Sequence, residues 1–157
     1  EVNKMMRTQP ISVTLKDGEI VRGMGKLLVN DSTNNTMALT AAGQIALGVT
    51  ADESSRTAVS PHPYETTGAT VGYYPLGGVL LVQVDATSTF NIGATVYVSG
   101  DGLATSTVGS NKKLGIYVGD AAHPATALTA PLGGNEGQSG LTEGAFIRVN
   151  TNSADIA

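Results

Sequence analysis

The chain has 157 residues, a length that suits one domain, and its formal net charge is −4. Because it contains no Cys, a disulfide, a thiolate metal ligand and a cysteine nucleophile are all excluded. Only 9 residues are Lys or Arg, against 13 Asp or Glu, and phosphate binding needs clustered positive charge, so we expect no nucleic-acid partner.

The first ten residues predict an extended N-terminal arm, because residues 1–10 show no alternation of apolar and polar side chains and end in Pro10. A strand follows, and its buried face is expected to consist of alternate apolar residues: Ile11, Val13 and Leu15. The sequence Lys-Asp-Gly-Glu at 16–19 predicts a hairpin turn with a return strand from residue 20, since Asp-Gly tolerates positive φ.

The middle of the chain predicts strands separated by polar loops. Residues 37–51 predict two strands around a turn at 41–43, and residues 52–64 predict a loop rich in Ser and Pro. A further strand is expected at 69–74. The run VLLVQV at 79–84 predicts the strongest strand, and its apolar stretch is far too short to cross a bilayer, so we expect no membrane partner.

A hairpin and another strand follow. Residues 93–99 alternate, with Val96 and Val98 on one face, and the Gly-Asp-Gly turn at 100–102 leads into a short return strand. The segment LGIYV at 114–118 predicts a strand with three inward side chains: Leu114, Ile116 and Val118.

The predicted organisation is a single β domain over residues 11–150, preceded by the arm and followed by a polar tail at 151–157. Within the domain, residues 120–144 predict a long irregular loop before a last strand at 146–149. No window carries a helical stripe, and about nine or ten short strands joined by Gly-rich loops predict an all-β fold, a small β-sandwich or β-barrel.

Two pairs of short segments resemble each other. LGVTAD at 47–52 is similar to LGIYVGD at 114–120, and GATVGY at 68–73 is similar to GATVYV at 93–98. We attribute both to the common composition of hairpin strands rather than to duplication, because the segments are short.

The residue types that catalysis needs are scattered. His62 and His123 each precede a Pro in a predicted loop, so we expect exposed turn residues rather than metal ligands. Acidic residues occur singly, and neither a nucleophile elbow nor a phosphate-binding loop is present. We therefore expect no enzymatic activity, no cofactor and no metal.

Four segments resemble the bacteriophage capsid decoration (cement) proteins. They are AAGQIALGVTADESS at 41–55, GGVLLVQVDATSTFNIGATVYVSGDGLATST at 77–107, KKLGIYVGDA at 112–121 and FIRVN at 146–150. The likeness covers Gln44 to Asn150 and rests on Gly and small-residue positions rather than on a catalytic signature. The first 40 residues and the 120–144 loop depart from the family pattern.

The resemblance implies a structural virion protein added to the outside of an expanded capsid. Its partner would be the major capsid protein, its oligomeric state a homotrimer and its location the capsid exterior. Such a protein needs a rigid block with docking segments, and many copies on one shell multiply a modest affinity at each site.

Two sets of contact residues follow as hypotheses. In the arm, Met5, Met6, Arg7 and Pro10 are expected to contact the capsid, because Met side chains adapt to irregular grooves and an extended segment can add to a sheet; a terminus that merely frays is the alternative. On the strands, the trimer contacts are expected at three residues: Leu81, Gln83 and Tyr97.

Other functions stay open. One is a different phage structural β-domain, such as a tail tube using residues 52–68 as an inter-subunit hairpin, or a head fibre. Another is a receptor- or carbohydrate-binding module, for which Tyr64, Tyr73 and Tyr74 would supply the aromatic platform. The last is a hydrolase that uses scattered carboxylates.

Overall fold

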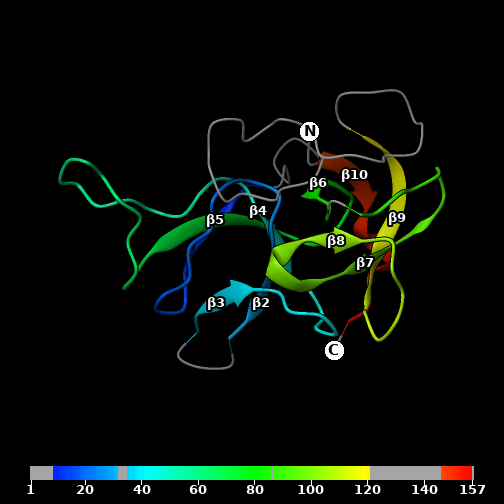
Figure 1. Ribbon diagram of the computed structural model, residues 1–157, viewed down its shortest axis with the longest axis horizontal. Coiled ribbons are helices and arrows are strands. Elements are labelled where there is room, and N and C mark those ends of the chain that lie inside the picture. The colour runs from blue at the N-terminus through cyan, green and yellow to red at the C-terminus, as the bar shows by residue number, and fades with distance from the viewer. Residues whose placement is uncertain (1–8, 32–34, 86, 121–145, 157) are drawn as a thin grey trace, which may run out of the picture.

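The computed structural model describes residues 9–31, 35–85, 87–120 and 146–156, and the fold is all-β, as predicted. Ten strands form two five-stranded antiparallel sheets, which make a small β-sandwich (Figure 1). The first sheet contains β1 (Ile11–Thr14), β2 (Leu27–Asn30), β3 (Met37–Leu39), β4 (Gly48–Thr50) and β5 (Thr70–Pro75). The second contains β6 (Val79–Gln83), β7 (Thr95–Val98), β8 (Ala104–Thr105), β9 (Lys113–Asp120) and β10 (Phe146–Asn150). The described part of the chain holds no helix with the length and hydropathy of a membrane span.

The two sheets follow one another along the chain and share one strand order. The first runs β1-β5-β4-β2-β3, and the second runs β6-β10-β9-β7-β8, which is the same order with each strand replaced by its counterpart in the second half. The registers agree as well. Gly48 of β4 pairs with Leu28 of β2, and Gly115 of β9 pairs with Val96 of β7. We call residues 11–75 the first unit and residues 79–150 the second unit.

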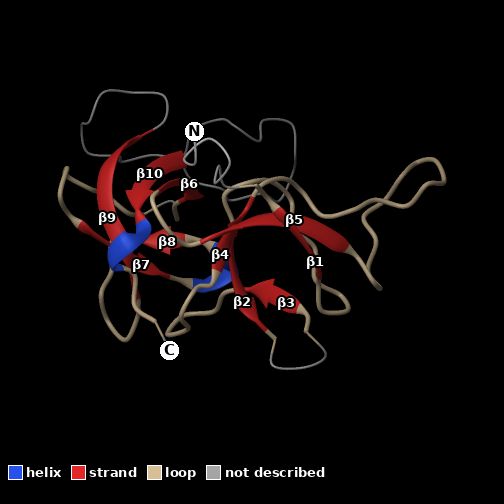
Figure 2. Cartoon of the chain, turned by 180° about the vertical axis from the view of Figure 1, so that it is seen from behind, coloured by secondary structure: helices blue, strands red, loops and turns tan. Residues whose placement is uncertain are grey.

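The edges of each sheet meet in the same way. An isolated parallel bridge joins Leu15, directly after β1, to Met37 at the start of β3, and another joins Val84, directly after β6, to Ala104 at the start of β8. Beside these bridges, Lys16 donates its backbone N–H to the carbonyl of Met37 in the first unit. Asp85 donates its backbone N–H to the carbonyl of Ala104 in the second unit, and both distances are 2.9 Å. Each sheet is therefore rolled until its first and third strands touch, and Figure 2 shows the two rolled sheets side by side.

One of the two sequence similarities reflects this repeat. LGVTAD lies on β4 and LGIYVGD on β9, which are counterparts, and the turns before them are also alike. Gln44 donates its N–H to the carbonyl of Ala41, as Asn111 does to Val108. The two segments of this pair thus lie on equivalent strands of the two units. The second pair lies on β5 and β7, which are not counterparts.

Each unit has its own core, and the first unit contributes to both. The core of the first unit consists of Leu15, Val21, Leu28, Met37, Ala69 and Val71. The larger core lies inside the second unit, around the stacked rings of Phe90 and Tyr117, whose centroids are 5.5 Å apart. Three residues of the first unit complete it: Leu27, Ala46 and Val49. Consecutive leucines of β2 thus face different cores, which joins the two units into one block.

The predicted strands are largely present, but two predicted faces are wrong. In β9, Leu114 is buried as expected, whereas Tyr117 is buried and Val118 exposed. The reason is a pair of register shifts, one against β10 and one against β7, because a bulge reverses the alternation beyond it. Ile11 is exposed because it begins an edge strand outside the core of the first unit.

The predicted hairpin at residues 16–19 is half right. The turn forms, with Gly18 at a φ of 86°. The return strand does not form, because β1 pairs with β5 instead, and strand structure resumes only at Leu27. The local sequence therefore predicted the turn correctly, whereas tertiary packing determines which strand pairs with β1.

Candidate docking site

The most prominent feature of the surface is a projecting segment between β4 and β5. We call residues 52–65 the docking arm. In Figures 1 and 2 it extends along the longest axis of the molecule, away from β6 and β10. The sequence predicted a loop here but gave no sign that the loop has a fixed structure.

The base of the docking arm is anchored in the body. Ser54 is buried, donates its N–H to the carbonyl of Val21 at 2.8 Å and accepts the N–H of Val21 on its Oγ at 3.0 Å. One residue further, the hydroxyl of Ser55 donates to Glu65 Oε2 at 2.6 Å, and the N–H of Glu65 donates back to the carbonyl of Ser55 at 3.0 Å. Both ends of the docking arm are thus fixed by paired hydrogen bonds.

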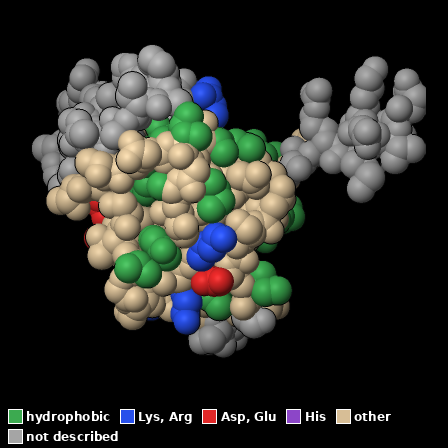
Figure 3. All heavy atoms as spheres, turned by 90° about the vertical axis from the view of Figure 1, so that its right-hand side faces the viewer, with side chains coloured by type: hydrophobic (Ala, Val, Ile, Leu, Met, Phe, Trp, Pro, Cys, Tyr) green, Lys and Arg blue, Asp and Glu red, His purple; other side chains and the backbone are tan. Residues whose placement is uncertain are grey.

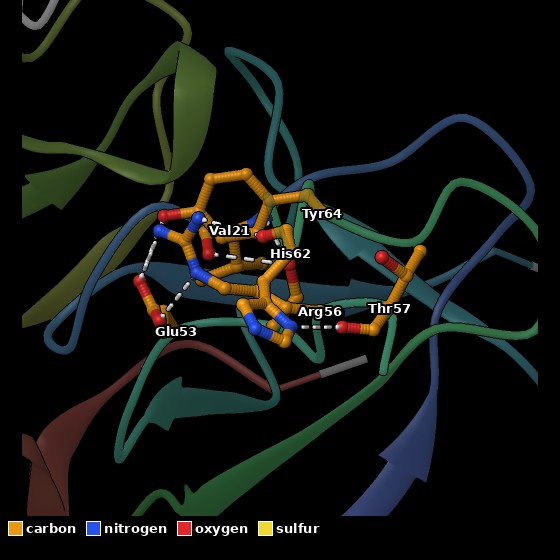
Figure 4. A network of polar contacts seen from close by, with 7 residues as sticks. Val21, Glu53, Arg56, Thr57, His62 and Tyr64 are labelled. Atoms are coloured by element: carbon orange, nitrogen blue, oxygen red, sulfur yellow. Dashed lines mark hydrogen bonds and ion pairs between the residues drawn. The ribbon is translucent and has the colours of Figure 1, made fainter. Parts of the chain in front are cut away.

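A charged cluster holds the two sides of the docking arm together (Figure 4). Arg56 donates from Nε to Glu53 Oε1 at 2.9 Å and from Nη2 to Glu53 Oε2 at 3.2 Å, and the hydroxyl of Tyr64 donates to Glu53 Oε2 at 2.7 Å. The guanidinium of Arg56 also lies 3.9 Å from the centroid of the Tyr64 ring, and that of Arg22 lies 5.4 Å from it. We call Glu53, Arg56 and Tyr64 the arm clamp.

The electrostatics of the arm clamp follow from these contacts. The hydrogen bonds that Glu53 accepts from Arg56 and then from Tyr64 hold the pKa of its carboxyl below the ordinary value of 4.5. Burial, and then the hydrogen bond to Glu53, raise the pKa of Tyr64. At neutral pH the carboxylate is therefore charged and the phenol protonated, which is the state that the hydrogen bonds require.

Beyond the arm clamp the tip is ordered by its own hydrogen bonds. Thr57 donates its N–H to the carbonyl of Pro63 at 2.8 Å, and His62 donates its N–H to the carbonyl of Val59 at 2.8 Å. His62 is an exposed turn residue, as predicted, with a φ of 59° and Nδ1 at 3.1 Å from the carbonyl oxygen of Thr57. Residues 57–63 contain no Asp, Glu, Lys or Arg, and Val59 is 74% exposed. The tip is thus a preformed projection that contains no Asp, Glu, Lys or Arg and exposes Val59.

A second feature is a cavity of about 510 Å³ at the junction of the two units, which we call the edge groove. Its walls are Met24, Val49, Thr50, Tyr74, Gly77, Gly78 and Val79 to Leu81, and none of these is Asp, Glu, Lys, Arg or His. One wall is β6, an edge strand of its sheet, and Val79 is 53% exposed there. The edge groove therefore combines apolar side chains with the free side of a strand.

The predicted contact residues have different outcomes. Met5, Met6 and Arg7 lie outside the described residues, and Pro10 is exposed beside β5, with its side chain facing Gly72. Leu81 is half-buried and lines the edge groove, and Tyr97 is half-buried on β7, which two strands, β10 and β9, separate from β6 in the sheet order. These two residues are therefore not brought together.

Gln83 does not lie on an exposed face, contrary to the prediction, because its side chain is only 1% exposed. Its Nε2 donates to the carbonyl of Met24 at 2.8 Å, and its backbone N–H donates to the carbonyl of Gly25 at 2.8 Å. The apolar run at 79–84 predicted the strand but not that the first unit covers its end. Gln83 is thus a contact between the units and not a surface for another molecule.

The alternative sites predicted from the sequence are not assembled in the part of the chain that the structure describes. No group of three His, Cys, Asp or Glu residues that could hold a metal is found among the described residues. The three tyrosines have different surroundings: Tyr64 belongs to the arm clamp, Tyr73 packs against the core of the first unit and Tyr74 lines the edge groove. His123 and the loop at 120–144, apart from Asp120, lie outside the described residues.

Comparison with known proteins gives no family assignment. No protein-family model matches the chain, and no curated protein matches it.

Proposed function

We propose that this protein is a structural virion protein that binds the outer surface of an assembled phage capsid as a decoration protein. Its partner is the major capsid protein, and it acts as a homotrimer without catalytic activity. The observation that carries the proposal is the docking arm, whose projecting tip is held in place by the arm clamp on a block of two joined units. The resemblance of the segments between Gln44 and Asn150 to the decoration proteins supports the same function.

The physical argument is one of preorganisation. A loop that must be ordered on binding costs about 0.5–1.5 kcal/mol for each immobilised side chain, and the docking arm has its order before it meets a partner. The surface also suits assembly, since only 14% of the residues are charged and weakly charged surfaces tend to associate. Figure 3 shows one such face, with scattered apolar side chains and few charged ones.

The proposal is tested by adding the purified protein to expanded, undecorated phage capsids and imaging them by cryo-electron microscopy. We expect density on the outer surface of the shell at repeated positions. Arg56→Gln, which breaks the arm clamp, should lower the affinity for the shell by about threefold, because the ion pair with Glu53 is exposed. Lys112→Gln, the same change of charge at an exposed position, should leave the occupancy unchanged. Capsids that stay bare with the unmodified protein would contradict the proposal.

A tail tube is the second candidate, because tube subunits interlock through projecting hairpins and the docking arm has that form. Head fibres and receptor- or carbohydrate-binding modules belong to the same group of phage β-domains. The same imaging distinguishes them when tails are included: filaments of the protein or density along tails would favour the tube.

A further inference from the structure

We infer that residues 151–155, which follow β10, form a strap that closes over the connection between the two units and opens as one piece. We call residues 151–155 the strap, and residues 76–78, between β5 and β6, the linker. The inference concerns a conformational device at the junction of the units. It therefore goes beyond the proposed function and does not depend on it.

The first argument is that polar main-chain groups of the linker find their partners in the strap. Gly77 donates its N–H to Oγ1 of Thr151 at 2.8 Å, and Gly78 donates its N–H to Oδ1 of Asn152 at 2.8 Å. The carbonyl of Gly78 accepts the N–H of Thr151 at 2.8 Å and its hydroxyl at 2.9 Å. Four hydrogen bonds therefore join two adjacent residues of the linker to two adjacent residues of the strap.

Thr151 is the centre of these contacts, and it is only 3% exposed. Its hydroxyl both accepts and donates, so an apolar group of the same shape would leave the N–H of Gly77 without its acceptor. Gly78 has a φ of 67°, a left-handed backbone that glycine adopts readily, and the hydrogen bonds of the strap hold it there. The strap thus fixes a pair of residues that have little conformational preference of their own.

The second argument is that the far end of the strap is fixed to β9. Asp155 donates its N–H to the carbonyl of Lys113 at 2.9 Å, and the N–H of Lys113 donates back to Oδ2 of Asp155 at 2.8 Å. Between its two attachments the strap forms a 3-10 helix at Thr151–Ser153, and the N–H of Ala154 donates to the carbonyl of Thr151. This internal structure couples the two attachments, so we expect the strap to be released as a whole.

The third argument is that the strap is held by hydrogen bonds rather than by a core. Within it only Thr151 is buried, Ala154 is half-buried and the other residues are exposed. Among the described residues, neither core cluster includes a residue of the strap. A segment with few buried apolar contacts opens at a lower free energy than the units it lies on. We therefore expect the strap to open while both units stay folded.

Opening of the strap changes the edge groove, because the linker forms part of its wall. Gly77 and Gly78 lie in that wall, and the next residue, Val79, begins β6. The core that Leu27 and Val49 share with the second unit does not involve the strap and stays packed. The motion is therefore local: it frees the linker and one wall of the edge groove while the two units remain together.

Native-state hydrogen exchange followed by NMR tests the inference in the unmodified protein. One opening event should expose the five amides that join the strap to its neighbours, which are those of Gly77, Gly78, Lys113, Thr151 and Asp155. We expect these five amides to share one opening free energy. They should exchange at least about tenfold faster than two hydrogen-bonded amides of buried core residues, Leu15 and Tyr117.

The variants centre on the hydroxyl of Thr151. Thr151→Val removes the hydroxyl and keeps the shape of the side chain, so it should speed the exchange of all five amides by about tenfold, including that of Lys113 at the far end of the strap. Thr151→Ser keeps the hydroxyl and should retain slow exchange. The matched control is Thr107→Val, the same change at an exposed threonine of the second unit, which should leave the five rates unchanged.

Two results in the unmodified protein would overturn the inference. One is unequal opening free energies for Gly77 and Lys113, because the strap would then not open as one piece. The other is exchange of these amides only together with those of Leu15 and Tyr117, because the strap would then open only when the units unfold.

A second variant keeps the test decisive if Thr151→Val disturbs folding, as judged by circular dichroism. Asn152→Ala replaces it, since Asn152 is exposed and loses only its side-chain bond to Gly78. Faster exchange at Gly78 alone in this variant would refute the coupling, whereas faster exchange that reaches Lys113 supports it. No capsid is present in these measurements, so failure of the inference leaves the proposed function untouched.

Discussion

The two neighbouring leucines of β2 give the sharpest test of how the block is held together. Leu27 and Leu28 are both fully buried, but Leu27 lies in the core of the second unit and Leu28 in the core of the first. Truncating Leu to Ala removes three carbons, which corresponds to about 2.4 kcal/mol of transfer free energy. The cavity left behind adds to this, and buried Leu→Ala substitutions typically lower the free energy of unfolding by about 2.7–5.0 kcal/mol. We expect Leu27→Ala and Leu28→Ala each to lower the free energy of unfolding by roughly 3 kcal/mol.

The assay is urea denaturation followed by circular dichroism, together with hydrogen exchange of peptides from each unit. Leu27 belongs to the first unit in the sequence but packs in the core of the second, so the two units should unfold together. Both variants should therefore lower the protection of backbone amides against hydrogen exchange in both units, with a single unfolding transition. Leu47→Ala is the matched control: the side chain is 45% exposed, so the loss should stay at about 1 kcal/mol or below. Separate transitions for the two units, or a cost below 1 kcal/mol for Leu27→Ala, would refute the reasoning.

The remaining predictions concern a close approach, a core ring and the arm clamp. Gly115→Ala should cost about 1–3 kcal/mol in thermal unfolding because a Cβ there would overlap the main chain of β10, whereas Gly100→Ala, with open space, should be neutral. Phe90→Ala should cost about 3–5 kcal/mol, since the ring is buried and stacked, and a loss below 1.5 kcal/mol would show a looser core. The carboxyl of Glu53 should titrate by NMR below pH 4.5 and move upward in Arg56→Gln. Because its folded-state pKa is lowered, the arm clamp should stabilise the docking arm above pH 4.5 and lose that effect as the pH falls through the lowered pKa, which faster amide exchange of residues 56–64 would report.

The sequence allowed the fold class to be predicted but not the pairing of the strands. Apolar alternation placed most strands correctly, as at Val96 and Val98, which are both buried as expected. Alternation failed at Tyr117 and Val118, because a bulge depends on the neighbouring strands and leaves no local signal. The repeat of the two units was visible only as the short similarity between β4 and β9, too brief to be told from hairpin composition.

The candidate site could be predicted even less. The arm clamp joins Glu53, Arg56 and Tyr64, and only the spacing of Glu53 and Arg56 is local enough to be noticed in a sequence. The edge groove brings together residues from both units, so it depends wholly on tertiary structure. Gln83 was expected on an exposed face because an apolar run in the sequence does not reveal what covers the strand.

Among the described residues, the contribution to the other unit's core runs in one direction, from the first unit to the second. The position of the second unit that pairs with β9 as Leu27 pairs with β4 is Thr95, a polar side chain that suits a wet surface better than a hydrophobic interior. Expressed alone, the second half would expose the apolar core side chains that Leu27, Ala46 and Val49 cover in the intact chain.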